Sequence, residues 1–272
     1  MTNPTVLITG TTSGIGKAAA TALAERGATV LTVARDAARG RAAIADIERR
    51  VPGARLALYT ADLGDLAAVR DLAERIADVH DRLDVLINNA AVARSRPGAE
   101  MFTTNHLAPF LLTNLLLPLL TRSAPARVIT VGSGAHRQVR DIPWDDLPAA
   151  TTYPLSKVCN ILFSYELARR TKGTGVTSNC ADPGFVRTGL GRHLTGAMGL
   201  FITLTRPFQT SPETGAATPV YLATAPEVAQ TSGVTFAKCR PARTSPLTRD
   251  PDAARRLWEI SANAVPTPGQ PE

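Results

Sequence analysis

The sequence predicts a single α/β domain in which a parallel sheet of about seven strands carries helices on both faces. The chain has 272 residues, of which 44% are hydrophobic and 19% charged, and this is enough for one large globular domain. Short β-branched runs alternate with longer Ala- and Leu-rich segments of helical periodicity almost throughout. An alternation of this kind is typical of parallel strands joined by helical crossovers.

The strands are expected at the β-branched runs, namely Thr5–Thr9, Thr29–Ala34, Arg55–Tyr59, Val85–Asn88, Arg127–Val131, Val176–Ala181 and Val234–Phe236. The helices are expected between them, at Ile15–Arg26, Ala37–Arg50, Leu66–His80, Phe102–Thr121, Pro154–Thr171 and Pro212–Ala223. Right-handed crossovers then favour a doubly wound, Rossmann-type sheet whose ligand lies outside the carboxyl ends of the strands. We expect the domain to span residues 1–264, with a Pro- and Gly-containing disordered end at 265–272.

Composition and charge restrict the compartment and the partners. No run of about 18 apolar residues occurs, and the first ten residues lack a basic segment ahead of an apolar one, so a cytoplasmic protein without stable membrane insertion is expected. Cys159, Cys180 and Cys239 lie too far apart for a disulfide framework or a close metal-ligand motif, so no metal is expected. The net charge of +7 comes from scattered basic residues, which favours a solvated surface over a nucleic-acid partner.

A glycine-rich turn follows the first predicted strand and opens the first helix. Glycines there let the backbone turn sharply and approach a pyrophosphate, and the helix N-terminus offers free N–H groups. A plain tight connection is the alternative, because the spacing departs from G-x-G-x-x-G. The candidate dinucleotide-binding residues of this turn are Gly10, Thr12, Ser13, Gly14, Ile15 and Gly16.

The end of the second strand indicates which dinucleotide binds. Arg35 stands where a carboxylate would hold the ribose 2′-hydroxyl of NAD, and the first acidic residue is Asp36. Arg35 beside Lys17 would instead pair with a 2′-phosphate, because a guanidinium matches phosphate geometry. We therefore expect NADPH/NADP as the cofactor, with an exposed surface arginine as the alternative.

Two further strand ends supply candidates for the adenine and ribose rim. Asp62 and Leu63 follow the third strand, although Asp62 could equally cap the next helix. Asn89 and Ala90 follow the fourth strand, where the amide could equally lock neighbouring strands together.

The strongest chemical signal is Tyr153 followed by Lys157, because this spacing puts phenol and ammonium on one side of a helix. By chance such a pair is expected roughly 0.06 times in this composition. Pro154 suits the first helical position and would leave Tyr153 as an extended cap residue. The helix dipole and Lys157 would then lower the tyrosine pKa by about three units, which suits proton transfer near neutrality.

Two polar residues complete the candidate site. Ser133 follows the fifth strand between two glycines, where its hydroxyl can hold a substrate carbonyl. Asn105 is an unfavourable residue inside a predicted helix unless its amide is used, and it could hold a water that connects Lys157 to solvent. An exposed mid-helix asparagine is the alternative.

These residues resemble the short-chain dehydrogenases/reductases along almost the whole chain. Four stretches are similar to the retinol-dehydrogenase-like branch, namely Asn105-His106-Leu107, Ser133-Gly134-Ala135-His136, Ser156-Lys157-Val158-Cys159-Asn160-Ile161-Leu162-Phe163 and Leu257-Trp258-Glu259. The resemblance implies that Tyr153 is the acid/base, that Lys157 assists it, that Ser133 orients the carbonyl and that Asn105 serves a water relay. It further implies cofactor contacts, and the residues concerned are Pro183, Gly184, Val186 and Thr188. Two residues depart from the family pattern. Ala91 replaces the glycine that usually closes the Asn-Asn-Ala motif, and Asp182 precedes the Pro-Gly pair where this branch often has histidine.

The expected function is hydride transfer between NADP(H) and a lipophilic ketone, aldehyde or secondary alcohol, as in a carbonyl reductase for a natural product or a retinoid-like compound. The apolar segment 187–208 is expected to close over such a substrate, with core packing, a dimer contact or a membrane-surface helix as alternatives. A catalytically silent dinucleotide-binding regulatory protein, a nucleic-acid-binding protein and a non-redox enzyme of the same fold are the rival functions. Both a monomer and a homodimer remain open.

Overall fold

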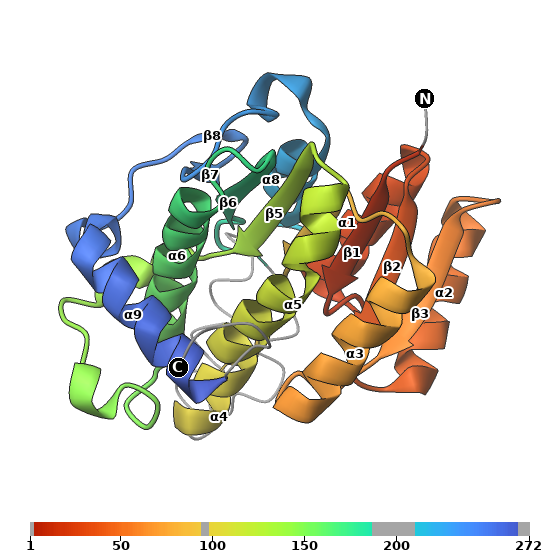
Figure 1. Ribbon diagram of the computed structural model, residues 1–272. Helices are drawn as coiled ribbons and strands as arrows, with labels where there is room; N and C mark the ends of the chain where they lie inside the picture. The colour runs from red at the N-terminus through yellow and green to blue at the C-terminus, as the bar shows by residue number, and fades with distance from the viewer. Residues whose placement is uncertain (1–2, 94–97, 187–209, 266–272) are drawn as a thin grey trace.

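The computed structural model describes residues 3–93, 98–186 and 210–265, and at its centre lies one sheet (Figure 1). Its eight strands follow the order β3-β2-β1-β4-β5-β6-β7-β8. The neighbouring strands run parallel except for β7 and β8, which are antiparallel. The chain builds outward from β1 to β3 and then restarts at β4 on the other side of β1. This reversal creates the topological switch point at which a doubly wound sheet binds its ligand.

The strands agree with the sequence prediction to within one residue at each end. They are β1 Thr5–Thr9, β2 Thr29–Ala34, β3 Arg55–Thr60, β4 Val85–Asn88, β5 Ala126–Val131, β6 Val176–Asp182, β7 Thr235–Ala237 and β8 Arg240–Pro241. The two-residue β8 was not predicted. It pairs with β7 through a turn in which Lys238 and Cys239 both have positive φ, and this conformation matches a tight hairpin.

The helices also agree, with two differences. They are α1 Gly14–Glu25, α2 Ala37–Arg50, α3 Leu66–Val79, α4 Gly98–Phe102, α5 Ala108–Arg122, α6 Tyr153–Arg170, α8 Pro212–Thr224 and α9 Pro251–Ala264. The single helix expected over Phe102–Thr121 is wrong, because a π-helical turn, Thr103–Leu107, separates α4 from α5. Two helices were not predicted at all, namely the short α4, which ends where the expected helix begins, and the amphipathic α9.

Short 3-10 turns connect several of these elements. They are Gly134–Gln138 after β5, Trp144–Asp146, Pro226–Val228 and Pro246–Arg249.

Two apolar cores fill the space between the sheet and its helices. Leu7 of β1 belongs to the core under α3, α5, α6 and α9, whereas its neighbours Val6 and Ile8 belong to the core under α1 and α8. Adjacent residues of a strand point to opposite faces, so a continuous apolar strand serves both cores. Helices therefore cover both faces of the sheet, as predicted. Because β1 to β7 run parallel, their carboxyl ends lie at one edge.

Helix α9 lies across α6 in Figure 1. Trp258 of α9 packs against Phe110 of α5, with ring centroids 4.8 Å apart, and against Phe163 of α6 at 5.9 Å. The C-terminal helix therefore covers the seam between the two helices that follow β4 and β5. Among the described residues no helix combines the length and the apolar character needed to cross a membrane.

Candidate active site

A cleft of about 1250 Å³ opens at the carboxyl ends of the strands, around the switch point. Most of the residues predicted to contact a dinucleotide line it. They are Gly10, Thr12, Ser13, Gly14, Ile15, Gly16, Arg35, Asp62, Leu63, Asn89, Ala90, Tyr153, Lys157 and Pro183. Gly184 and Val186 do not line it, and Thr188, with the apolar segment 187–208, lies outside the described residues.

The turn between β1 and α1 is shaped for close backbone approach. Gly10 and Gly14 have φ values of +74° and +59°, which L side chains rarely adopt. A Cβ on Gly16 would lie 2.3 Å from the Gly10 carbonyl oxygen and 2.5 Å from Asn89 Nδ2, so only glycine fits there. Ser13 precedes α1 without capping it through its side chain. The first N–H groups of α1 are thus left for another acceptor, and this cradle fits a pyrophosphate.

Asn89 both lines the cleft and ties two strands together. Its Nδ2 donates to the Thr9 carbonyl at 2.7 Å, and its backbone N donates to Thr9 Oγ1 at 3.0 Å. The amide therefore locks β4 to β1 at the base of the cleft, as the alternative interpretation of this residue expected.

At the end of β2, Arg35 lines the cleft and is exposed. The expectation that Lys17 stands beside it is wrong, because the Lys17 ammonium pairs with Asp46 of α2 and does not line the cleft. The second cation of this wall is Arg39, one turn into α2. Sequence reasoning missed Arg39, although its spacing of four from Arg35 across a helix start was a usable signal.

Asp62 lies at the rim after β3, and it is not the helix cap. Its Oδ1 accepts a hydrogen bond from Gly64 N at 2.9 Å, whereas Asp65 caps α3 by accepting from Ala67 N. Asp62 is exposed and lines the cleft beside Leu63.

Tyr153 begins α6 at the far end of the cleft from the arginines. The residue that caps the helix is Thr152, whose hydroxyl accepts from Leu155 N at 3.4 Å, so Tyr153 is the first helical residue and the expectation that it is the cap is wrong. Burial raises the pKa of Tyr153, while a hydrogen bond with Ser133 lowers it and Asp182 raises it further. The expected lowering is therefore wrong, because loss of solvent outweighs the favourable contacts of the phenolate.

Lys157 lies one turn further along α6 and is 2% exposed. Its Nζ donates to the Val131 carbonyl at 2.8 Å and lies 5.6 Å from the centroid of the Tyr153 ring. Burial lowers the pKa of Lys157 to about 8, although Cys180 and Asp182 oppose that shift. The ammonium is thus held by the end of β5, close to the tyrosine but not directed at its hydroxyl.

Ser133 follows β5 and is brought to Tyr153 as predicted. Its hydroxyl caps the short turn that begins at Gly134 by accepting from Ala135 N at 3.2 Å. The preceding Gly132 lines the cleft, where a Cβ would lie 2.7 Å from Cys180 Sγ. The serine, just after the end of β5, is thus hydrogen-bonded to the tyrosine that begins α6.

Asn105 lies in the π-helical turn and is fully buried, so the exposed mid-helix alternative is wrong. Its Oδ1 accepts from Val92 N at 2.7 Å, and its Nδ2 donates to Val92 O at 2.8 Å and to Ser156 Oγ at 3.1 Å. Both amide hydrogens are therefore used by protein groups. Asn105 connects the strand-end loop after β4 to the turn of α6 that carries Lys157.

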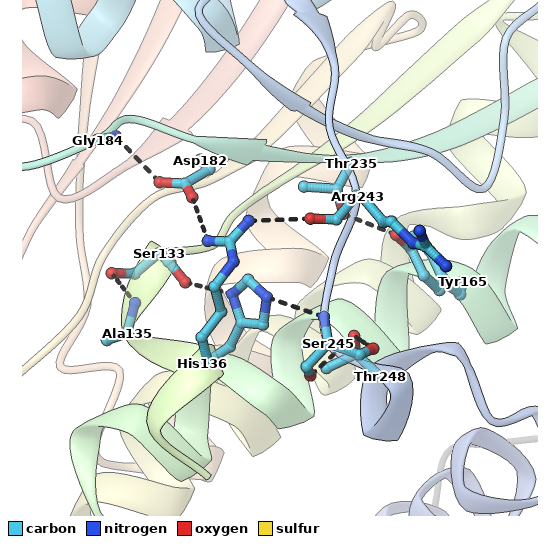
Figure 2. Close-up of polar contacts among 11 residues, drawn as sticks. Ser133, Ala135, His136, Tyr165, Asp182, Gly184, Thr235, Arg243, Ser245 and Thr248 are labelled. Atoms are coloured by element: carbon cyan, nitrogen blue, oxygen red, sulfur yellow. Dashed lines mark hydrogen bonds and ion pairs between the residues drawn. The ribbon is translucent and has the colours of Figure 1, made fainter.

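A polar network behind Ser133 was missed at the level of sequence (Figure 2). Ser245 N donates to His136 Nε2 at 3.3 Å, so the other ring nitrogen carries the hydrogen and donates to Ser133 O at 2.7 Å. Burial lowers the pKa of His136, which favours this neutral form. The histidine thus ties the backbone of Ser133 to the segment after β8.

A parallel sheet with this cradle at its switch point, and with a half-buried tyrosine and serine beside a buried lysine at the adjoining edge, defines a class of Rossmann-type oxidoreductases. The short chain dehydrogenase family matches residues 4–198. Human retinol dehydrogenase 14 is 41% identical over 96% of this chain and 86% of its own, and human retinol dehydrogenase 13 is 40% identical over 96% and 84%. The chain therefore belongs to the short-chain dehydrogenase/reductase family, in its retinol-dehydrogenase-like branch.

Solved structures agree with this assignment. An uncharacterized protein from Mycobacterium paratuberculosis superposes with a TM-score of 0.74 at 32% identity, covering 96% of this chain and 92% of its own. A short chain dehydrogenase from Shigella flexneri, solved in complex with NADP, gives a TM-score of 0.73 at 25% identity, covering 88% and 98%. The chain is thus an oxidoreductase of a family whose members include dehydrogenases and reductases.

Proposed function

We propose that this protein is an NADP(H)-dependent carbonyl reductase that acts on lipophilic ketones or aldehydes and, in reverse, on secondary alcohols. The observation that carries the proposal is Tyr153, which lines the cleft, is hydrogen-bonded to Ser133 and has its pKa raised by loss of solvent. A phenol that stays protonated near neutral pH can donate a proton to a carbonyl oxygen, which suits the reductive direction.

The roles of the side chains follow from this arrangement. Ser133 holds the carbonyl oxygen, and Tyr153 delivers the proton from its hydroxyl to that same oxygen. A nicotinamide held in the cleft would supply the hydride to the carbonyl carbon, or would accept it when an alcohol is oxidised. Since Tyr153 and Ser133 share a hydrogen bond, one oxygen can be held by both.

Lys157 and Asn105 support the proton transfer. The Lys157 ammonium, anchored on the Val131 carbonyl, places a positive charge near the tyrosine ring, and it would be available to the ribose of a bound dinucleotide because it lines the cleft. Asn105 bonds to Ser156, the residue before Lys157, and so fixes this turn of α6. We propose that Asn105 serves the water relay of the family, and this role is supported by its position alone. Its amide hydrogens are already engaged by Val92 and Ser156.

The preference for NADP(H) is supported by the wall formed by β2 and α2. Arg35 and Arg39 line this part of the cleft, and Asp36 between them accepts from Arg39 N at the start of α2 instead of lining the cleft. Two guanidinium groups suit a 2′-phosphate, and a carboxylate directed at the ribose would suit NAD. The NADP complex of the related Shigella flexneri protein supports the same preference.

The substrate class rests on the relatives. The names of retinol dehydrogenases 13 and 14 refer to a lipophilic alcohol, and both cover most of this chain. We extend this only to lipophilic carbonyls and alcohols, including retinoid-like compounds and natural-product intermediates. The Pro183–Val186 segment, with the exposed Phe185, leads from the cleft toward residues outside the described part.

The test is the oxidation of NADPH and NADH by the purified full chain with a panel of lipophilic ketones and aldehydes, beside Tyr153→Phe. We expect turnover that prefers NADPH and falls by at least about 100-fold in Tyr153→Phe, because the proton donor is lost. Binding of NADPH, followed by its fluorescence, should persist in the variant. Tight NADPH binding without turnover on any carbonyl or alcohol would instead favour a silent dinucleotide-binding regulator.

A further inference from the structure

Asp182 ends β6 directly before the Pro183-Gly184 turn. Its side chain is only 10% exposed. One carboxylate oxygen, Oδ1, accepts a hydrogen bond from Gly184 N at 3.0 Å. A carboxylate buried at the edge of the cleft is costly unless another group balances its charge.

The balancing charge comes from Arg137, in the turn after β5. Its Nη1 lies 3.9 Å from Asp182 Oδ2, and its Nη2 donates to the Arg243 carbonyl at 2.9 Å. The guanidinium is thus held between the Asp182 carboxylate and the Arg243 carbonyl. Gly134 lies beside both partners, since a Cβ there would lie 3.4 Å from Arg137 Nη1 and 3.5 Å from Asp182 Oδ2.

The two ionisable groups that the proposed function needs both respond to Asp182. Burial is the largest influence on each, raising the pKa of Tyr153 and lowering that of Lys157, and the negative charge of Asp182 raises both. The ionisable groups around Asp182 are His136 and Arg137 after β5, Cys180 on β6, and Tyr153 and Lys157 on α6.

Within the described residues, the other elements that pack on β6 bring no further ionisable group to Asp182. The three residues of β7, Thr235–Ala237, contain none. On α8, the pKa shifts of Glu213 and Tyr221 arise from groups other than Asp182. Arg127 of β5 donates to the Leu222 and Ala225 carbonyls instead.

We propose that Asp182 and Arg137 are positioning residues whose opposed charges set the pH at which Tyr153 transfers its proton. This rests on the function proposed above for Tyr153. The carboxylate repels a tyrosinate and the guanidinium offsets that repulsion, so the balance between them decides how readily the phenol ionises. The hydrogen bond to Gly184 is separable from this effect, because an amide oxygen can accept it equally well.

Each variant should shift the pH at which Tyr153 ionises in a defined direction. Asp182→Asn keeps an acceptor for Gly184 N but removes the negative charge, so Tyr153 should ionise at lower pH. Arg137→Gln leaves Asp182 without its counter-charge, so Tyr153 should ionise at higher pH. The double variant removes one charge of each sign and should return close to the wild type. Each single shift should be roughly half a pH unit.

The experiment measures ionisation of Tyr153 with and without turnover. The ultraviolet absorbance of tyrosinate is followed through a pH titration of the full chain, and the same titration of Tyr153→Phe is subtracted to isolate this phenol. The pH profile of alcohol oxidation by the NADP-loaded protein is recorded for the same variants, because oxidation requires Tyr153 to give up its proton first. Opposite shifts in the single variants and near cancellation in the double variant are expected in both measurements.

Asp78→Asn, an equal charge change on the exposed face of α3, is the matched control. Thermal unfolding of every variant checks that the fold is retained. Shifts of the same sign in Asp182→Asn and Arg137→Gln, or a shift in Asp182→Asn no larger than in Asp78→Asn, would overturn the charge pair. Opposed tyrosinate shifts in a chain that oxidises no alcohol would keep the charge pair and overturn the proposed function instead.

Discussion

At the scale of single residues, the two arginines after β2 offer a direct test of cofactor preference. Arg35→Ala and Arg39→Ala should each weaken NADPH binding by about 10- to 100-fold, because each removes charge-assisted hydrogen bonds to a 2′-phosphate worth roughly 1.5–3 kcal/mol. NADH has no such phosphate, so its binding should change little. Fluorescence titration of both dinucleotides against each variant measures the difference.

Lys17→Ala is the matched control for these variants. It removes the same charge nearby, but the Lys17 ammonium is engaged by Asp46 and does not line the cleft. Its NADPH affinity should stay close to that of the wild type. If Lys17→Ala weakens NADPH binding as much as Arg35→Ala does, the loss comes from the overall positive charge of the protein and the arginine pair has no specific role.

The residues of the site differ in how far the sequence could predict them. The glycine turn, Ser133, Tyr153 and Lys157 follow strand ends or a helix start, and local spacing was enough to place them together. The pKa direction of Tyr153 was wrong, because burial depends on what packs over the phenol and not on its neighbours in sequence. Asp182 and Arg137 meet only through the pairing of β5 with β6.

At the scale of elements, the π-helical turn Thr103–Leu107 depends on one side chain. Asn105 satisfies both the N–H and the carbonyl of Val92, in addition to Ser156. Asn105→Ala would remove both partners of the Val92 backbone and one of the two bonds of Ser156 Oγ, so the free energy of unfolding should fall by roughly 2–4 kcal/mol. Urea denaturation measures this loss.

Asn114→Ala is the comparison within the adjoining α5. Its Nδ2 makes a single bond, to the Phe110 carbonyl within the same helix, and the residue is half-buried. Its loss should cost less than about 1 kcal/mol. Equal losses in the two variants would mean that the turn does not depend on Asn105.

Among the elements, strands were predicted better than the connections. Continuous β-branched runs bounded by turn residues fixed β1, β2 and β4 to the residue. The π-helical turn leaves no mark in local periodicity, since it depends on a contact with Val92. By contrast, α9 had a usable signal, because Asp250 caps it ahead of Pro251 and its buried residues recur at helical spacing.

At the scale of the whole molecule, the position of α9 bears on self-association. Trp258 packs on both α5 and α6, and Arg170 lies 4.3 Å from the centroid of its ring. The surface of α5 and α6 beneath Trp258 is therefore covered within one chain and cannot contact a second copy. We expect the full chain to be a monomer at micromolar concentration, as sedimentation velocity can establish; a stable dimer would show that a different face associates.

The same C-terminal helix makes the molecule sensitive to acid. His106 of the π-helical turn bonds through Nε2 to Ser261 of α9 at 2.7 Å, and burial lowers its pKa from 6.5 to about 3. The folded state therefore keeps this ring neutral while the unfolded chain takes up a proton below about pH 6.5, so stability is lost as the pH falls from about 6.5 to 3. The loss is roughly 1.4 kcal/mol for each pH unit.

His106→Phe tests that account, because a phenyl ring fits among Phe102, Phe110 and Phe163 but cannot be protonated. At pH 7 the variant should be less stable than the wild type, because it lacks the bond to Ser261. The difference between their free energies of unfolding should narrow as the pH is lowered to 4. Urea unfolding at several pH values measures the two curves. If they stay parallel, the carboxylates of the molecule and not the histidine beneath α9 determine its acid stability.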